Sequence, residues 1–299
     1  MAWIVLSIAA AAFQTLRFML QKTLSGGALS AGGATLARFF YSTPFVLSLA
    51  FGYVLWSGAD WPALSGAFWA YAMTGGLAQI LATWCVVAIF AHRNFAVGIT
   101  FKKTEVVQTA LIGFVLLGDT VSLWGLGAIA LGLVGVLILS DNPGEAGGFA
   151  RRIMNRAAGL GLLSGAFFAV SAVCYRGATL EVPSDDAFFR AVVALAIVTT
   201  SQTLALSAWL SWREKGELGR VIAARKTAVW MGLTGLGGSI CWFTAFTLQN
   251  AAYVFAVGQV EVIFSIAASV LFFGERMARK ELAGIGFLTV SILALVLLG

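Results

Sequence analysis

Charged residues, histidine, cysteine and proline are all scarce in this chain. Of its 299 residues, 11% are charged, 1 is histidine, 3 are cysteine and 4 are proline. A soluble domain carries about 25% charged residues, so a water-soluble globular protein is excluded. Four prolines against 34 glycines also exclude a proline-rich low-complexity chain. Hydrophobic residues make up 60% of the chain and the mean hydropathy is +0.92, which predicts a polytopic membrane protein.

The few reactive residues exclude several kinds of site. Cys85, Cys174 and Cys241 lie within apolar runs, which fits neither a disulfide framework nor a zinc site. The histidine, His92, lies in a short polar joint, which argues against a histidine metal site or a catalytic triad. Because the sequence shows no clustered nucleophile and no Walker-type loop, we expect neither an enzyme nor direct ATP drive. No cofactor or metal is expected.

Ten apolar segments approach the length of about 20 residues that a helix needs to cross a bilayer. They cover residues 2-22, 34-56, 67-91, 95-117, 122-140, 158-180, 187-211, 227-248, 251-273 and 279-298. These runs lack the alternating polarity of membrane β-strands. We therefore predict an all-α polytopic membrane protein with ten transmembrane helices.

Basic residues are distributed unevenly over the nine joints between these segments. We number these joints from one to nine, starting at the N-terminus. The odd-numbered joints and their edges hold thirteen Lys or Arg. The even-numbered joints hold acidic residues, and the basic residues that flank them are Arg176 and Arg190. The positive-inside rule then places the odd joints in the cytoplasm and both termini outside. The net charge of +6 is thus explained by membrane orientation, and no nucleic-acid partner is expected.

The two halves of the chain match each other in order and spacing. Thr104–Val107 aligns with Val260–Ile263 at an offset of 156, which superposes Glu105 on Glu261. An offset of 152 superposes Arg38 on Arg190. The shifts between these offsets fall in joints, where insertions are tolerated. The sequence therefore predicts an internal repeat.

The predicted repeats are 1-140 and 158-299, joined by a cytoplasmic linker at 141-157. Each repeat holds five spans, so the second enters the membrane from the opposite side. An inverted repeat of this kind is the usual basis of alternating-access transporters, with the substrate site near the midplane. Because both repeats lie in one chain, a monomer is sufficient.

Two glutamates lie near the middle of predicted spans, where a carboxylate costs about 2.5 to 3.5 kcal/mol and so faces a cavity or a partner. Lys102 lies on nearly the same helix face as Glu105, but no cation lies within a turn of Glu261. Desolvation favours the protonated form of such a carboxylate, which makes Glu261 the candidate proton carrier. The alternative is that both glutamates are structural and pair with Arg17 or Arg190.

Further polar and aromatic side chains within the spans predict a central substrate cavity. Its candidate residues are Gln14, Arg17, Gln79, Thr83, Lys102, Glu105, Ser171, Tyr175, Ser239, Trp242, Glu261 and Ser265. Small polar residues also promote ordinary helix packing, so each Ser or Thr has that alternative, and a deep Trp has it too. The fifth and tenth spans are almost wholly apolar, and we expect them to be peripheral supports.

Three features of the chain point to one family: two five-helix halves, an Arg early in the second helix of each half, and a Glu with a following Gly-acid pair. Together they resemble the drug/metabolite transporter superfamily, EamA type, over essentially the whole chain. The residues concerned are Arg38, Arg190, Glu105 with Gly118-Asp119, and Glu261 with Gly274-Glu275. The chain departs from the family at Val106 and Val262, where a proline often follows the glutamate. Any kink there has to come from other residues.

Within the superfamily, the sequence is most similar to exporters of aromatic and other hydrophobic amino acids in bacterial inner membranes. The resemblance implies a helical basket whose central cavity opens alternately to each side. In such a membrane, the orientation expected from the basic residues makes both termini periplasmic. It implies an amino acid as the small-molecule substrate and lipid as the surrounding medium. Efflux of drugs or lipophilic cations is the alternative, and a membrane-embedded enzyme or a channel is less well supported.

Overall fold

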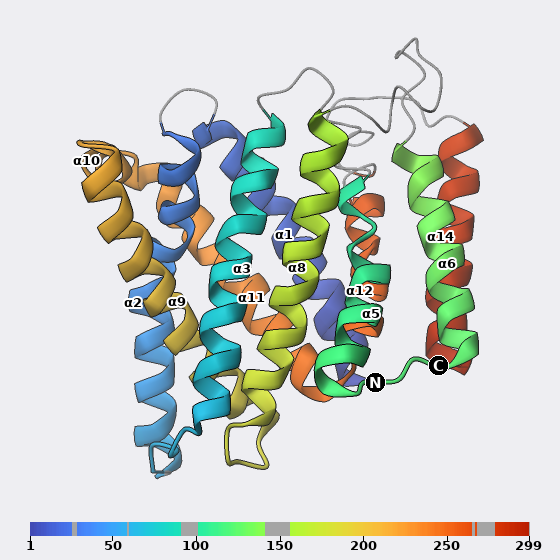
Figure 1. Ribbon diagram of the computed structural model, residues 1–299, viewed down its shortest axis with the longest axis horizontal. Helices are drawn as coiled ribbons and strands as arrows, with labels where there is room; N and C mark the ends of the chain where they lie inside the picture. Colours follow the sequence, from blue (N-terminus) through green and yellow to red (C-terminus); the bar gives the residue numbers. More distant parts are fainter. Residues whose placement is uncertain are drawn as a thin grey trace.

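The computed structural model describes residues 1–25, 29–58, 60–90, 101–140, 156–264, 267 and 279–298. All regular structure in these ranges is helical, which confirms the predicted all-α class. The helices are α1 Ala2–Ser25, α2 Ala31–Ser57, α3 Gly66–Phe90, α5 Glu105–Leu117, α6 Leu123–Ser140, α8 Arg156–Leu180, α9 Ala187–Arg213, α10 Glu217–Ala223, α11 Arg225–Leu248, α12 Ala251–Gly258 and α14 Arg279–Leu298 (Figure 1).

Six of these helices, α1, α2, α3, α8, α9 and α11, are long and apolar enough to cross a membrane. Four shorter apolar helices lie within the remaining predicted spans, at Glu105–Leu117, Leu123–Ile138, Ala251–Phe264 and Leu282–Leu297. The chain is therefore a multi-pass membrane protein, and the number of ten spans stays a prediction. Residues 141–155 of the predicted linker lie outside the described residues, while Arg156 already begins α8.

The fourth helix of each predicted repeat is interrupted, which the sequence analysis missed. Lys103 and Thr104 form a turn immediately before α5, and Gln259 forms a turn between α12 and the helical residues 260–264. Lys103 and Gln259 are related by the repeat offset of 156. The predicted continuous spans 95-117 and 251-273 are therefore broken at equivalent positions. In both cases the break lies two residues before the glutamate.

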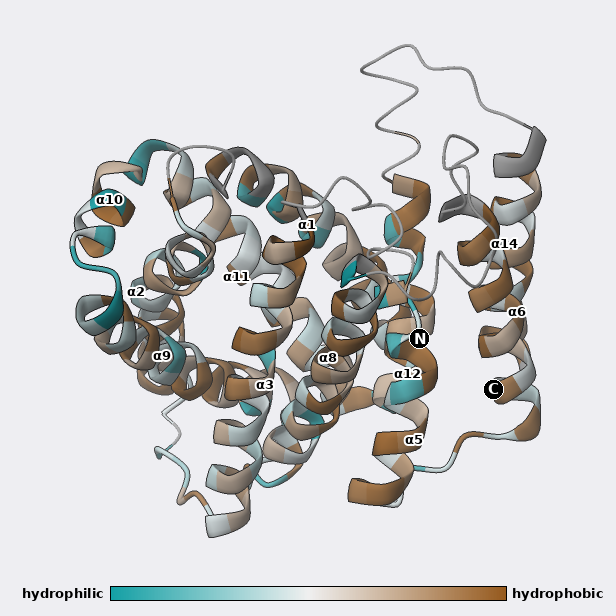
Figure 2. Cartoon of the chain, turned by 45° about the horizontal axis from the view of Figure 1, so that its top comes forward, coloured by the Kyte–Doolittle hydropathy of each residue, from teal (hydrophilic) through white to brown (hydrophobic). Residues whose placement is uncertain are grey.

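Helices from the two halves of the chain pack against each other throughout the bundle. The most extensive cross-half pairings are α3 with α8, α6 with α14, α1 with α11, and α2 with α9; α5 packs against both α8 and α12, and α11 also packs against α2. Figure 1 shows the two ends of the chain at the same end of the bundle as the joints α2–α3, α5–α6 and α8–α9. The short helix α10 lies at the opposite end, and it is more hydrophilic than the long helices (Figure 2).

The joint around α10 carries a cluster of basic residues. They are Arg213, Lys215, Arg220, Arg225 and Lys226. This basic cluster and the chain ends therefore lie at opposite ends of the described bundle, as the positive-inside rule requires for termini outside. Which end faces the cytoplasm stays a prediction.

Helices α6 and α14 form a pair at one edge of the bundle (Figure 1). A Cβ on Gly135 would lie 2.8 Å from the carbonyl oxygen of Gly284 and 2.9 Å from the amide nitrogen of Leu288. Ser291 of α14 donates a hydrogen bond of 2.6 Å to the carbonyl oxygen of Ala128. The absence of a side chain at Gly135 thus permits backbone-to-backbone packing, and this pair supports the bundle from outside.

We expect Gly135→Ala to separate α14 from α6 because its methyl group would overlap backbone atoms. The matched control is Gly127→Ala on the same helix, since a Cβ there meets nothing within 4 Å. Overpacking of this kind costs about 1 to 3 kcal/mol. Thermal unfolding of the two purified variants in detergent measures the difference. Equal stability of the variants would contradict the close packing.

Candidate functional site

Two adjoining cavities lie between the halves of the chain and share the side chains of Gln14, Phe168, Trp242 and Phe255. The Arg38 cavity is further lined by Arg38, Gln79, Ser171, Ala172, Tyr175, Ser239, Phe243 and Phe246. The Glu261 cavity is further lined by Lys102, Glu105, Gly258, Gln259 and Glu261. Nine of the twelve candidate site residues therefore line these two cavities: Gln14, Gln79, Lys102, Glu105, Ser171, Tyr175, Ser239, Trp242 and Glu261.

Both cavities are small in this conformation. The free volume is about 30 Å³ in the Arg38 cavity and about 20 Å³ in the Glu261 cavity. That is room for about one or two water molecules in each. A substrate the size of an amino acid can enter only when the lining helices or side chains move apart. The structure therefore shows a closed form of the site.

Glu261, in the second half of the chain, contacts two side chains of the first half. The ammonium group of Lys103 lies 3.0 Å from Oε2 of Glu261, and Gln14 donates a second hydrogen bond of 3.0 Å to the same oxygen. The sequence analysis found no cation within a turn of Glu261, and the structure supplies one from the other half. The ion pair offsets part of the cost of burying this carboxylate and links the two halves of the chain.

Glu105 is paired within its own segment, as its spacing predicted. Lys102 Nζ lies 3.0 Å from Glu105 Oε1, and the two side chains are 3% and 5% exposed. The ammonium group also lies 4.8 Å from the ring centroid of Phe168. Two ion pairs from consecutive lysines thus lie side by side, one within the first half and one between the halves.

The turn before α5 contains Lys103 and is fixed by local contacts. Thr104 donates a side-chain hydrogen bond of 2.7 Å to the carbonyl oxygen of Phe101, which closes the turn that contains Lys103. In α8, Gly165 permits close packing on this turn, since a Cβ there would lie 3.0 Å from the carbonyl oxygen of Lys102. Consecutive residues of a helix or helical turn point about 100° apart, so Lys102 and Lys103 face different neighbours.

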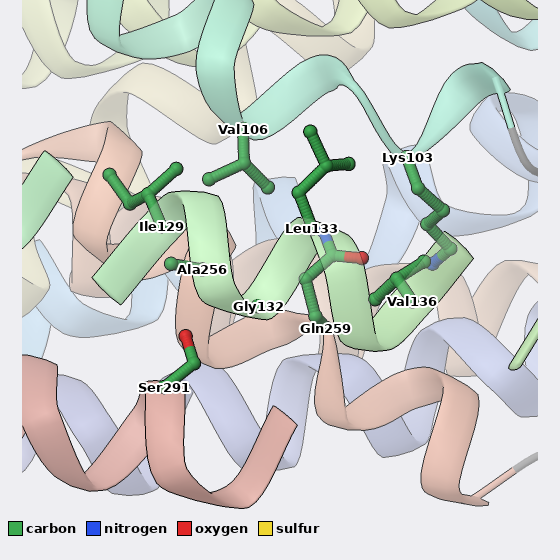
Figure 3. A pocket seen from close by; sticks show the side chains of 9 residues that line it. All are labelled: Lys103, Val106, Ile129, Gly132, Leu133, Val136, Ala256, Gln259 and Ser291. Atoms are coloured by element: carbon green, nitrogen blue, oxygen red, sulfur yellow. The ribbon is translucent and has the colours of Figure 1, made fainter. Parts of the chain in front are cut away.

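Lys103 also borders a third, smaller cavity between α5 and α12 on one side and α6 and α14 on the other. Its free volume is about 10 Å³, and its lining includes Val106, Gly132, Gln259 and Ser291 (Figure 3). This space holds at most one water molecule. The lysine thus lies where the central bundle meets the α6–α14 pair.

An amide network joins α3, α8 and α9 at the wall of the Arg38 cavity. Tyr175 donates a hydrogen bond of 2.9 Å to Oε1 of Gln79, and Gln202 donates one of 3.0 Å to the same oxygen. Gln202 also donates to the carbonyl oxygen of Gly76 at 2.9 Å. The sequence analysis missed Gln202, although a lone amide in the middle of an apolar span signals such a role.

Arg38 and Arg190, which the predicted repeat aligns, have different surroundings. Arg38 Nη2 donates to Ser239 Oγ at 3.3 Å inside the cavity. Arg190 instead donates to the carbonyl oxygens of Thr179 and Leu180 at the end of α8, at 2.8 Å and 2.6 Å. The alternative that Arg190 pairs with a buried glutamate is therefore wrong. Arg190 thus contacts carbonyls of the last turn of α8, where the helix itself supplies no i+4 donors.

Arg17 is buried next to Arg38 and does not line either cavity. Its Nη1 donates to Gln21 Oε1 at 3.3 Å, and its guanidinium carbon lies 4.2 Å from the ring centroid of Phe18. The charges of Arg38 and Glu261 both act on Arg17. The sequence also allowed an ion pair between Arg17 and Glu261. The described contacts do not include one.

The remaining candidates are placed less centrally. Thr83 is fully buried in α3 but lines neither cavity. Ser265 lies outside the described residues. Trp242 lines both cavities and stacks on Phe246 with ring centroids 5.7 Å apart and an interplanar angle of 15°. Gly258 lets this indole approach α12 closely, because a Cβ there would collide with the Trp242 ring.

Comparison with known proteins supports a membrane transporter. Residues 155–297 match the EamA-like transporter family. A protein of Sinorhizobium sp described as an uncharacterized transporter in the cobO 3′ region is 28% identical over 138 residues, which are 45% of this chain and 92% of that protein. A protein crystal structure matches with a TM-score of 0.72 and 13% identity, over 99% of this chain and 96% of the other. At this identity the structural likeness shows the fold alone.

We expect Lys103→Met to destabilise the protein strongly, because it removes the ammonium group that Glu261 contacts in a buried setting. Removal of one partner from a buried pair costs about 3 to 5 kcal/mol. The double variant Lys103→Met/Glu261→Gln is expected to recover much of this loss, since neither charge then remains. Unfolding in detergent measures the change in free energy of unfolding for Lys103→Met, for Glu261→Gln and for the double variant, each relative to the wild-type protein.

The control is Lys215→Met, because Lys215 is exposed in the joint before α10. It should change the free energy of unfolding by about 0.5 kcal/mol or less. If the effects of Lys103→Met and Glu261→Gln simply add in the double variant, the two residues are not coupled.

Proposed function

We propose that this protein is a secondary transporter that exports amino acids, with aromatic and hydrophobic ones favoured, or similar small metabolites. It works by alternating access in a bacterial inner membrane, with both termini in the periplasm. The observation that carries this proposal is the closed, charged and aromatic cavity between the two halves. The ion pair between Lys103 and Glu261 joins the two halves next to this cavity. The likeness of residues 155–297 to EamA-like transporters supports the same function.

The helix pairings support an inverted repeat in this protein. Exchange of the two halves converts the α1–α11 pair into the α8–α3 pair and leaves α2–α9, α5–α12 and α6–α14 unchanged. The equivalent helix breaks at Lys103 and Gln259 fit the same relation. The Sinorhizobium protein aligns over nearly all of its own length with less than half of this chain, as a single repeat unit would. Repeats of this kind bind substrate at their interface next to broken helices.

Transport requires the contacts that close the cavity to break on one side at a time. Lys103 and Gln14, which both hold Glu261, come from the first half of the chain, whereas Glu261 comes from the second. A relative movement of the halves therefore separates these groups and opens space beside Trp242. The helix breaks provide places where the backbone can bend without losing a long run of hydrogen bonds.

Proton coupling and facilitated uniport are both compatible with this site. In a coupled cycle, Glu261 is the proton carrier, and it takes up a proton only while Lys103 is displaced. In a uniport cycle, the Lys103–Glu261 pair opens and closes without titration. The response of flux to a pH gradient distinguishes the two.

Efflux of lipophilic cations is the less favoured alternative. A cation needs a carboxylate that it can reach, and Glu105 and Glu261 already contact lysines at 3.0 Å. The aromatic walls at Trp242, Phe246 and Phe255 suit an apolar or aromatic substrate body in either case.

We expect saturable flux of labelled tryptophan and phenylalanine, and weaker flux of threonine, in proteoliposomes that contain the purified protein. If the transporter is an antiporter, an imposed pH gradient accelerates this flux and Glu261→Gln abolishes the acceleration while substrate exchange continues. The matched control is Glu181→Gln, because Glu181 is exposed at the end of α8 and accepts a hydrogen bond from Ser65.

Flux of unrelated lipophilic cations without amino-acid flux would support the alternative. A pH-driven component that survives intact in Glu261→Gln would exclude this residue as the proton carrier.

A further inference from the structure

The charges around the two cavities do not balance. Arg17, Arg38, Lys102 and Lys103 are each at least 95% buried, and they face two carboxylates, Glu105 and Glu261. Among the described residues this group therefore carries two positive charges more than negative ones. A buried charge without a counter-charge is costly, so such a site attracts an anionic group from outside the chain.

Among the described residues, Arg38 has a buried cationic donor nitrogen without any hydrogen-bond partner. Its side chain lines the Arg38 cavity and is 5% exposed. Nη2 donates to Ser239 Oγ at 3.3 Å, whereas Nη1 is buried and has no hydrogen-bond partner among the described residues. A guanidinium group presents its donors in a fixed fork that matches the two oxygens of a carboxylate. An unfilled buried donor at a cavity wall thus indicates where a ligand oxygen binds.

Arg17 lies next to Arg38 and adds positive charge near the cavity wall. Both arginines meet at Gly235 of α11, where a Cβ would lie 3.2 Å from Arg38 Cγ and 3.5 Å from Arg17 Cδ. The described partners of Arg17 are the uncharged groups of Gln21 and Phe18. The positive potential of Arg17 therefore adds to that of Arg38 at the cavity.

The carboxylates of the site offer much less to an ammonium group. Glu105 contacts the ammonium of Lys102, and Glu261 contacts that of Lys103 as well as Gln14. A substrate ammonium would have to compete with a lysine for either one. The anionic end of a substrate, in contrast, meets an available donor.

We infer that Arg38, assisted by Ser239, binds the carboxylate of the transported molecule, and that this carboxylate is the head group the protein requires. This inference rests on the proposed transport function and names the chemical class of its substrate. The rings of Tyr175 and Phe243, 4.3 Å apart at the wall of the same cavity, would border the apolar body of the substrate. The carboxylate can belong to an amino acid or to an acid that lacks the ammonium group.

A head-group series with a constant body tests this inference on the full-length protein. The probes are tryptophan, indole-3-propionate, which lacks the ammonium group, and tryptamine, which lacks the carboxylate. Phenylalanine, 3-phenylpropionate and phenethylamine form a second series. Binding is measured in detergent by the ligand-dependent rise in unfolding temperature, and flux is measured by counterflow in proteoliposomes.

The acids are expected to bind wild-type protein about 10- to 100-fold more tightly than the amines, as a charge-assisted hydrogen bond implies. Arg38→Gln should lose most of this preference, and Arg38→Lys should retain part of it because the charge stays while the fork is lost. Arg213→Gln is the matched control, since Arg213 is exposed at the end of α9. If the acid without ammonium binds as well as the amino acid, the carboxylate alone is recognised. If the amino acid binds more tightly, the ammonium group adds affinity.

Equal binding of acids and amines by the wild-type protein would overturn the inference, even if Arg38→Gln fails to fold. Binding of no acid in either series would also overturn it. Acid binding without any flux would leave the Arg38 subsite intact and refute the proposed transport function. Flux of amines or neutral compounds with no acid binding would refute the subsite and leave transport intact.

Discussion

Burial of charge inside an apolar bundle is the constraint on which the rest of this structure depends. Glu105 and Glu261 lie within helices that pack against apolar neighbours, where an isolated carboxylate is costly. The protein meets this cost with two consecutive lysines, and one of them reaches across to the other half of the chain. The stability of the closed cavity and its capacity to open therefore depend on the same contact.

Both of these helices are interrupted next to the buried charges. A turn at Lys103 and Thr104 precedes α5, and Lys103 contacts Glu261 while Lys102 contacts Glu105. The second turn, at Gln259, lies two residues before Glu261. Polar groups, irregular backbone and the two adjoining cavities thus coincide at the interface between the halves. Backbone irregularity at membrane depth is tolerated where it is buried in protein or lines a cavity.

Much of the fold could be predicted because apolar runs and local spacing determine it. The helical class and the Lys102–Glu105 pair follow from periodicity within single segments. The contact between Lys103 and Glu261 could not be predicted in this way, since it joins residues 158 positions apart and no local pattern marks it. Arg190 could not be placed either: the predicted repeat aligns it with Arg38, but its partners are carbonyls at the end of a helix. Sequence spacing indicates which face a residue occupies, but tertiary packing decides its partner.

Accessibility of one cavity position from both sides of the membrane tests alternating access most directly. Ser171→Cys would be prepared in a chain without Cys85, Cys174 and Cys241, because Ser171 lines the Arg38 cavity. In sealed, oriented vesicles, a membrane-impermeant anionic thiol reagent is added to one side or the other. The proposed cycle predicts labelling from both sides, with a transported substrate shifting the ratio of the two rates. Labelling from one side only, unchanged by every transported compound, would contradict it.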